Sequence, residues 1–350
     1  MYTLAAWFHD WSPFVVRFTD TLGIRWYGLA YALGFFLGWL GMRWLARRGL
    51  ILVPIERVTD VILAVVVGAV VGGRLGYVAF YQPGILVEFT SSFPYWDLLR
   101  MNRGGMASHG GMIGVVIACW WLSRPDRSIV RAREGEPPLR RAGATWHLLD
   151  VMALLAPMGL FLGRLANFVN GELLGKVVAP AGEPGPWWAV KFPKEVLERT
   201  KEWSADPELP NRLARVLDRV ALPGETWDVT YARVLERVQH GDTSLAREIE
   251  PLISSRVPSQ LLQAAAEGLV LGLALVIVRF RVRQHGVISA WFLIVYGVLR
   301  VVTEIWRLPD AHLSVARVAG LSRGQWLSVG MVVLGALLLM WIRVRNRRPA

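Results

Sequence analysis

The sequence predicts an all-α, polytopic membrane protein with seven transmembrane helices and a helical head outside the membrane. The chain has 350 residues, of which 54% are hydrophobic and only 19% are charged, a balance unlike that of an ordinary soluble protein. Seven apolar runs approach the roughly 20 residues that a helix needs to cross a bilayer. Clusters of arginine fall on alternate connections between these runs, which is the usual pattern of membrane topology.

The expected spans begin after a mixed segment, residues 2–21, in which aromatic residues stand beside His9 and Asp10. That composition suits a short interfacial helix. The spans are expected at residues of about 24–42, 58–81, 104–122, 145–163, 258–278, 286–305 and 325–342.

Charge placement orients the spans. The short segments after spans one, three, five and seven are rich in arginine, and the positive-inside rule makes their side cytoplasmic. We therefore expect the N-terminus outside and the C-terminus inside. The arginines concerned are Arg43, Arg47, Arg48, Arg57, Arg124, Arg127, Arg131, Arg133, Arg140, Arg141, Arg279, Arg281, Arg283, Arg343, Arg345, Arg347 and Arg348.

Three regions follow from this layout. Residues 1–176 hold the N-terminal interfacial segment and spans one to four, and residues 258–350 hold spans five to seven. Between them, residues 177–257 have the composition of a soluble domain and form the expected extracytoplasmic head. Short amphipathic helices are expected in the head, because apolar residues recur there at helical spacing, as in Leu209, Leu213, Leu217 and Val220.

Composition and motifs exclude several classes of protein. The formal net charge of +12 does not indicate nucleic acid, since the arginines form short clusters between apolar runs and not a basic groove. One cysteine, Cys119, permits no disulfide within the chain and suits plain packing. Phosphate-binding loops, paired-histidine zinc motifs and nucleophile elbows are absent, so we expect neither metal nor cofactor. The spacings Gly34/Gly38 and Gly68/Gly72 are expected to let helices approach closely.

The candidate site centres on residues 159–176, G-L-F-L-G-R-L-A-N-F-V-N-G-E-L-L-G-K. Arg164 and Asn167 share a helix face, with Asn170 about one turn further on. Gly171 and Gly175 bracket Glu172, where the backbone can turn sharply or admit a ligand. A structural alternative stays open, in which an interfacial helix ends here and its arginine reaches lipid phosphates.

Ionisable residues also gather at the outer ends of other spans. Each one alone is more often structural, but together they indicate a polar cavity that opens outward, because isolated charges in a membrane are costly. The set comprises Arg25, Tyr27, Arg74, His109, Arg164, Glu172, Arg300 and Glu304.

Seven segments of the chain resemble the prolipoprotein diacylglyceryl transferases. They are R-W-Y-G-L-A-Y (25–31), G-G-R-L-G-Y (72–77), G-G-M-A-S-H-G-G (104–111), G-R-L-A-N-F-V-N-G-E (163–172), V-P-S-Q (257–260), Y-G-V-L-R-V-V-T-E (296–304) and R-L-P-D (307–310). The resemblance implies an enzyme of the bacterial inner membrane. Such an enzyme moves the diacylglyceryl group of phosphatidylglycerol to the lipobox cysteine of a preprolipoprotein and releases glycerol phosphate. It implies phosphatidylglycerol, the preprolipoprotein signal peptide and membrane lipids as partners, and no nucleic acid.

The chemistry of this reaction assigns roles to residues. The thiolate of the substrate cysteine is the nucleophile, so a neutral histidine suits as its base. The departing phosphate gains charge, which a planar guanidinium stabilises. We expect catalytic roles for His109, Arg164, Arg300, Glu304 and Tyr27. We expect phosphatidylglycerol binding by Arg164, Asn167, Asn170, Glu172, Gly110, Gly111, Gly175 and Tyr296. Glu172 is expected to hold an arginine or the peptide backbone, and Glu304 to hold Arg300 one helical turn away.

The chain departs from the family pattern at two sites in its sequence and in the length of its head. Val257 stands where the family usually has histidine, and Leu262–Gln263 stand where it usually has a tyrosine and a glutamate. The segment 177–257 is also longer than the usual head. Either those positions are not needed for chemistry, or their role has moved.

Two other function classes are weighed. A transporter of an anionic solute would also use arginines near broken spans, but it should show an internal repeat, and none is found. An intramembrane hydrolase needs a serine nucleophile and a base. Ser108 and His109 are adjacent, and on a helix adjacent side chains point apart.

Overall fold

The structure is a computed structural model that describes residues 6–18, 23–91, 93–100, 105–124, 129–131, 139–198, 206–308 and 322–347. It is mostly helical, as the sequence predicts, and divides into two compact units. The first unit comprises Met1–Leu33, Pro157–Ala274 and Leu293–Leu334. The second unit comprises Gly34–Ala156, Leu275–Phe292 and Gly335–Ala350. Several long helices contribute residues to both units.

Within the described residues, six helical segments are long and apolar enough to cross a membrane. Their first residues lie within two residues of the expected starts, except that the segment of span two begins three residues earlier and that of span four begins four residues earlier. The segments are α1 (Trp26–Arg47), Ile55–Phe80 with α2 (Val58–Phe80), α4 (Arg141–Val169), Ser259–Arg281 with α9 (Ser259–Gln263) and α10 (Leu271–Arg281), Val287–Trp306 with α11 (Val287–Thr303), and Gly324–Arg345 in α12 (Arg323–Arg347).

The expected third span is shorter than the others. Helix α3 (Ser108–Leu122) has 15 residues, which gives a length of about 22 Å at 1.5 Å per residue, less than the roughly 30 Å of a bilayer core. Gly104, where this span was expected to begin, lies outside the described residues. The apolar part of α3 runs from His109 to Leu122.

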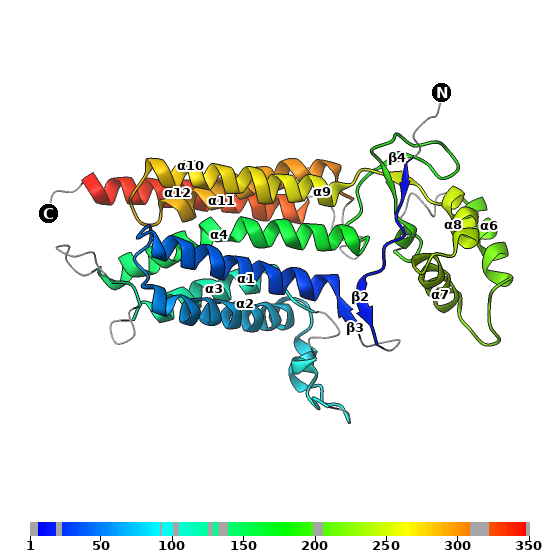
Figure 1. The fold of residues 1–350 in the computed structure, drawn as a ribbon, viewed down its shortest axis with the longest axis horizontal. Helices are drawn as coiled ribbons and strands as arrows, with labels where there is room; N and C mark the ends of the chain where they lie inside the picture. The colour runs from blue at the N-terminus through cyan, green and yellow to red at the C-terminus, as the bar shows by residue number, and fades with distance from the viewer. Residues whose placement is uncertain are drawn as a thin grey trace. The chain divides into compact units, whose positions relative to one another are not determined.

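Glycines allow α2 and α3 to pack closely in the second unit, side by side in Figure 1. A Cβ added to Gly72 would lie 2.4 Å from the carbonyl oxygen of Gly110, and one added to Gly114 would lie 1.9 Å from the carbonyl oxygen of Gly68. The close approach expected from Gly68/Gly72 is confirmed. At Gly38 the expectation is wrong, because a Cβ there would meet nothing within 4 Å.

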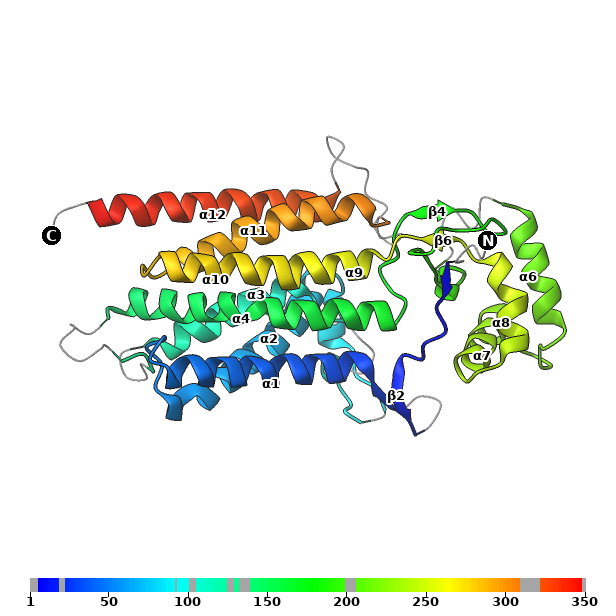
Figure 2. The ribbon, with the colours of Figure 1, turned by 45° about the horizontal axis from the view of Figure 1, so that its top comes forward.

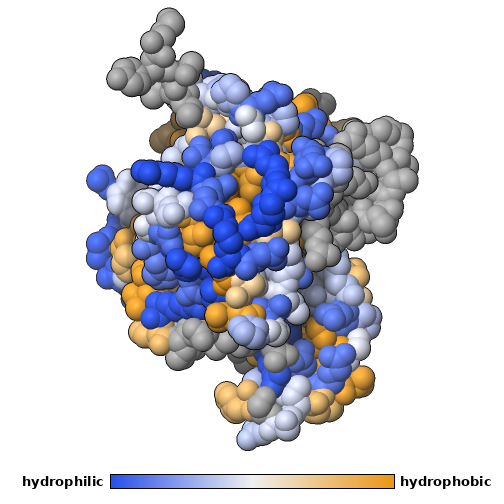
Figure 3. Space-filling view, turned by 90° about the vertical axis from the view of Figure 1, so that its right-hand side faces the viewer, coloured by the Kyte–Doolittle hydropathy of each residue, from blue (hydrophilic) through white to orange (hydrophobic). Residues whose placement is uncertain are grey.

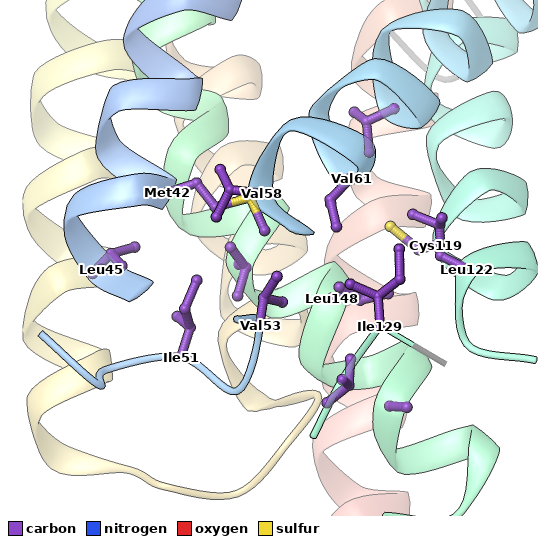
Figure 4. Packing of buried hydrophobic residues seen from close by; sticks show 14 residues of the cluster. Met42, Leu45, Ile51, Val53, Val58, Val61, Cys119, Leu122, Ile129 and Leu148 are labelled. Carbon is purple, nitrogen blue, oxygen red and sulfur yellow. The ribbon is translucent and has the colours of Figure 1, made fainter. Parts of the chain in front are cut away.

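The core of the second unit collects buried side chains from the end of α1, the following loop and helices α2 to α4. Figure 4 shows Met42 close to Val58, and Cys119 close to Leu122 and Ile129, within the same cluster. Cys119 is fully buried, which agrees with the packing role expected of it.

The described residues of the first unit contain a four-stranded sheet in the order β1-β5-β6-β4. Strand β1 (Trp7–Phe8) is parallel to β5 (Val190–Lys191), and β6 (Ser255–Arg256) is antiparallel to both β5 and β4 (Val177–Ala179). An all-helical head was expected. Strands of two or three residues are too short to show the alternating pattern by which a sequence reveals a strand.

The described part of the N-terminal segment, residues 6–18, is extended and not helical, which corrects the interfacial helix expected there. The backbone of β1 bonds to the head, with Trp7 N donating to Ala189 O at 3.0 Å and His9 N to Lys191 O at 2.9 Å. Further on, β2 (Phe14–Arg17) pairs with β3 (Gly23–Arg25). Pro13, which lies between β1 and β2, lacks an N–H group and disfavours a helix there.

The described residues of the head also contain three short helices. They are α6 (Glu208–Asp218), α7 (Trp227–Gln239) and α8 (Thr243–Ile249), which lie beside one another in Figures 1 and 2. Leu209, Leu213 and Leu217 pack into one buried cluster, as their spacing predicts. Figure 3 looks onto the side of the head that carries α6, where hydrophilic residues cover much of the surface with apolar residues between them.

Candidate active site

The end of α4 carries the expected site residues in the first unit. The helix ends at Val169, and Gly171 (φ 61°) and Leu173 (φ 58°) then adopt left-handed backbone conformations. The amide of Glu172 donates to the carbonyl oxygen of Asn167 at 3.0 Å, which satisfies a carbonyl at the helix end. The sharp turn expected at Gly171 is therefore present.

The backbone at Gly175 lies against another part of the chain. A Cβ there would lie 2.0 Å from the carbonyl oxygen of Val257, so only glycine fits. The guanidinium of Arg256 donates to the Gly175 carbonyl at 3.1 Å and pairs with Glu195, and both charged side chains are fully buried. In this structure the role of Gly175 is close packing of two backbone segments, and these contacts fix the loop after α4.

A carboxylate from another helix joins the two principal arginines. Glu267 Oε2 accepts from Arg164 Nε at 2.9 Å, and Glu267 Oε1 lies 3.5 Å from Arg300 Nη1. The Glu267 side chain is fully buried, and those of Arg164 and Arg300 are 15% and 13% exposed. One carboxylate thus holds two guanidiniums from two other helices.

Glu267 lies in a π-helical turn, Ala264–Val270, between α9 and α10. Such turns are rare and are frequent at functional sites. The sequence analysis missed this residue, although it is the only charged side chain in the expected span 258–278. An acidic residue within an apolar span is by itself a signal of function.

The arginine–carboxylate pairs continue along the end of α11. Arg300 Nη2 lies 3.1 Å from Glu304 Oε2, and Arg307 Nη1 lies 3.7 Å from the same oxygen. The expected pair of Arg300 with Glu304 is present in the structure. Arg307 is buried and was not among the expected site residues, and its motif continues into residues 309–310, which lie outside the described residues.

Two tyrosines border the arginine–carboxylate cluster, which consists of Arg164, Glu267, Arg300, Glu304 and Arg307. The side chain of Tyr296 lies beside that of Arg164 and interacts with it. The Tyr27 hydroxyl accepts from Asn167 Nδ2 at 2.9 Å. The structure therefore brings together six of the expected site residues: Tyr27, Arg164, Asn167, Tyr296, Arg300 and Glu304.

The charges of the cluster nearly balance but leave a positive excess. Arg164, Arg300 and Arg307 bring three positive charges against the two carboxylates of Glu267 and Glu304. A guanidinium has five N–H donors, and the pairs described above use only part of them at Arg164 and Arg300. The cluster is thus suited to bind one anion with oxygen acceptors, such as a phosphate.

Glu172 and Asn170 lie beside this cluster in the sequence but have other neighbours. The carboxylate of Glu172, which was expected to hold an arginine or the peptide backbone, lies 3.8 Å from Lys194 Nζ of the head. Its contact with the peptide backbone stays a prediction. Asn170 is buried, and its Oδ1 atom has no hydrogen-bond partner among the described residues. Asn170 and Lys194 line a small cavity together with His9.

Of the departures from the family pattern, Val257 and Gln263 are buried, whereas Leu262 is 42% exposed. Gln263 is fully buried in α9, and neither polar atom of its amide has a partner among the described residues. Gln260 donates from Nε2 to the carbonyl oxygen of Glu172 at 2.6 Å, and Ser259 donates from Oγ to that of Leu173 at 2.9 Å. The start of α9 therefore holds the loop after α4, while Gln263 offers an unpaired amide.

His109 belongs to the second unit, where it is the second residue of α3 and half-buried. Gly110 and Gly111 follow it in the first turn. A Cβ added to Gly110 would lie 2.2 Å from the carbonyl oxygen of Gly72, so this glycine permits packing against α2. The expected contacts of His109, Gly110 and Gly111 with substrate remain predictions.

Arg74, expected at a polar cavity, has a structural role in the second unit. Its guanidinium donates to the carbonyl oxygens of Asp97, Leu98 and Gly105 at 2.6, 2.8 and 3.0 Å. The buried arginine thereby holds the backbone that follows α2. Arg25, another expected member, lies with its guanidinium 4.9 Å from the ring centre of Phe14. Among the described residues, no three His, Cys, Asp or Glu side chains gather in a way that would hold a metal ion.

Comparison with known proteins assigns the chain to a family. Residues 13–341 match the family model described as prolipoprotein diacylglyceryl transferase. A phosphatidylglycerol–prolipoprotein diacylglyceryl transferase of Bdellovibrio bacteriovorus is 38% identical over 356 residues, which cover 97% of this chain and 95% of that protein. Proteins of the same name from Chromobacterium violaceum and Neisseria gonorrhoeae are each 34% identical and cover 93% of this chain and 94% of their own length. This chain belongs to the prolipoprotein diacylglyceryl transferase family.

Proposed function

We propose that this protein transfers the diacylglyceryl group of phosphatidylglycerol to the lipobox cysteine thiol of a preprolipoprotein. A thioether bond forms between the cysteine sulfur and the glycerol carbon. The bond between that carbon and the phosphate oxygen breaks, and glycerol phosphate leaves with the electron pair. The observation that carries the proposal for this chain is the pair of guanidiniums, Arg164 and Arg300, held by the single buried carboxylate of Glu267.

The arginines act on the leaving group. As the carbon–oxygen bond breaks, charge grows on the phosphate, and donors already aimed at it stabilise the transition state more than the ground state. Glu267 and Glu304 position the two guanidiniums and neutralise part of their charge before the lipid arrives. The remaining N–H donors of Arg164 and Arg300 take the phosphate oxygens, and Tyr296 and Asn167 fix the edge of the site.

The thiol proton requires an acceptor. We assign it to His109, since a neutral imidazole accepts a proton near neutral pH and general-base help is worth about 10²–10⁴-fold in rate. The proton passes from the thiol to the imidazole while the sulfur attacks carbon. Tyr27 is assigned a catalytic role beside Asn167. Asn170 and Glu172, together with Gly110, Gly111 and Gly175, are assigned to binding the donor lipid or the peptide around it.

The protein is proposed to cross the bacterial inner membrane seven times, with the N-terminus outside. Six crossings would put the two termini on the same side and would split the arginine-rich segments between both sides. Counting α3 as a crossing puts all four segments on the cytoplasmic side, as the positive-inside rule requires. A reporter that is active only in the cytoplasm should be silent when fused after Val220 and active when fused after Arg348. Strong activity after Val220 would overturn this orientation.

The function is tested by incubating the purified protein with phosphatidylglycerol labelled in its acyl chains and a lipobox peptide. Label should move to the peptide when its cysteine is present and should not move when the cysteine is replaced by serine. Release of labelled lipid without transfer would indicate a hydrolase. Binding without any chemistry would leave the transporter alternative, which the comparisons do not favour.

A further inference from the structure

A basic pocket in the second unit lies outside the arginine cluster and has no part in the proposed reaction. It has a volume of about 380 Å³, within the range of ligand pockets. Its lining includes the cations Arg140 and Arg345, the indoles of Trp146 and Trp341, and the polar side chains of Gln284 and His285. Among the described residues, its lining holds no acidic side chain.

Aromatic packing shapes the wall of the basic pocket. The rings of Trp146 and Trp341 have their centres 6.4 Å apart. Gly286, with φ at 91°, brings the start of α11 against them, since a Cβ there would lie 3.1 Å from Ile342 and 3.4 Å from Trp146. The guanidinium of Arg345 lies 5.3 Å from the ring centre of Trp341. The guanidinium of Arg345 is therefore held next to a rigid aromatic surface.

A pair of histidines lies beside the pocket. The amide of Leu52 donates to Nε2 of buried His147 at 2.9 Å. The Nδ1 atoms of His147 and His285 lie 3.4 Å apart. The basic pocket thus places the ring of His285 beside two permanent positive charges.

The face of α12 beside the pocket has the order of chemical groups that a phospholipid presents. Leu337, Trp341 and Arg345 follow one another at intervals of four residues and so share one helix face. Leu337 is 56% exposed and Trp341 is 46% exposed. An apolar residue, an interfacial aromatic and a cation thus succeed one another, which matches acyl chain, interface and charged headgroup.

We propose that this basic pocket binds the headgroup phosphate of an anionic phospholipid, with the acyl chains lying along α12. Arg140 and Arg345 take the phosphate charge, Gln284 donates a hydrogen bond, and the two indoles lie at the level of the glycerol backbone. Basic pockets between helices at a membrane surface favour anionic headgroups for this electrostatic reason. Arg140 precedes the first turn of α4, whereas Arg164 lies near the end of that helix, so this lipid is not the one that reacts.

The test is native mass spectrometry of the full-length protein in detergent, titrated with phosphatidic acid. The double variant Arg140→Gln with Arg345→Gln should lower the affinity for one bound lipid by about tenfold to thirtyfold, as expected from the loss of two cations near a membrane surface. The matched control is Arg281→Gln with Arg343→Gln, which removes the same charge from exposed arginines outside the pocket. This control should keep the lipid, and both double variants should unfold at the temperature of the parent protein.

Two further titrations separate the sources of the phosphate. Phosphatidylethanolamine, which has no net charge, should not occupy the pocket, and glycerol phosphate at millimolar concentration should not displace phosphatidic acid. Equal lipid binding by the two double variants would refute the pocket. Displacement by glycerol phosphate at the affinity of the lipid would refute the lipid and leave a site for a soluble anion.

Discussion

The substitution Glu267→Gln removes the carboxylate that joins the two principal arginines while it keeps the size of the side chain. At an effective dielectric constant of about 20, the contacts of 2.9 Å and 3.5 Å correspond to gross attractions of about 6 and 5 kcal/mol. Much of this is offset by the desolvation of three charges. Breaking one partner of a buried pair costs about 3–5 kcal/mol net, because the remaining charge is left without compensation.

The loss of the Glu267 carboxylate should affect mainly Arg164. Arg300 keeps its second carboxylate, Glu304, at 3.1 Å, whereas Glu267 is the carboxylate that pairs with Arg164 among the described residues. We expect the free energy of unfolding to fall by about 3 kcal/mol. The cluster gains one positive charge, so the anionic lipid should still bind with an unchanged or lower KM. The guanidiniums are no longer held in place, so kcat should fall by about 100-fold.

The assay compares Glu267→Gln with Glu250→Gln. Glu250 forms an ion pair with Lys191 at 3.4 Å, a similar distance, but its side chain is 38% exposed. The exposed pair should contribute less than about 1 kcal/mol, and its loss should leave transfer unchanged. Thermal unfolding in detergent gives the stability of each variant, and transfer of labelled lipid gives kcat and KM.

The reasoning fails if Glu267→Gln unfolds with the same stability as Glu250→Gln and transfers lipid normally. A rise in KM with unchanged kcat would also refute it, because Glu267 would then act in binding and not in positioning. Glu267→Asp keeps the charge on a shorter side chain that reaches one arginine at a time. It should recover most of the stability but little of the rate.

Four further changes test the rest of the site. Arg164→Lys keeps the charge but loses the planar fork, so transfer should fall by about 100-fold in the labelled-lipid assay, and equality with the parent would reduce Arg164 to a point charge. Arg300→Leu with Glu304→Leu leaves Glu267 paired to Arg164 but removes the Glu304 carboxylate from Arg307, so the protein should fold with lower stability and transfer almost nothing, whereas substantial transfer would make that pair structural. His109→Gln should lose about 10²–10⁴-fold in rate while folded, and near-normal transfer would remove this residue from the mechanism. Burial lowers the pKa of His9 from 6.5 to about 4. The stabilising contribution of its neutral ring is therefore complete above pH 6.5, and about 3 kcal/mol of the free energy of unfolding is lost as the pH falls toward 4. The stability difference between the parent protein and His9→Gln should change with pH by this amount, and a constant difference would contradict it.

The pattern of hydrophobicity determined where the membrane helices lie. Burial of an apolar run in lipid is a local property, so a window of about 20 residues was enough to locate six candidate spans within four residues of their starts. Helical periodicity likewise sufficed for contacts within one helix. The pair Arg300–Glu304 and the buried face of Leu209, Leu213 and Leu217 follow from a spacing of four residues.

Contacts between helices were decided by the tertiary structure alone. The local sequence pattern around Glu267 does not predict that its two carboxylate oxygens contact Arg164 and Arg300. Those residues are far apart in the sequence and come into contact only when three helices pack. For the same reason the sequence showed Arg74 as a charge in a span but not that its donors are used by backbone carbonyls.

The N-terminal strand is a backbone example of a contact that the tertiary structure alone decided. The aromatic composition of residues 2–21 indicated an interface, but composition does not state which backbone groups have partners. Strand β1 forms because the edge of β5 offers unpaired carbonyl groups at Ala189 and Lys191, to which Trp7 and His9 donate. Local preference determined the membrane helices and their faces, whereas the arginine–carboxylate cluster and the sheet depend on partners that only the folded chain supplies.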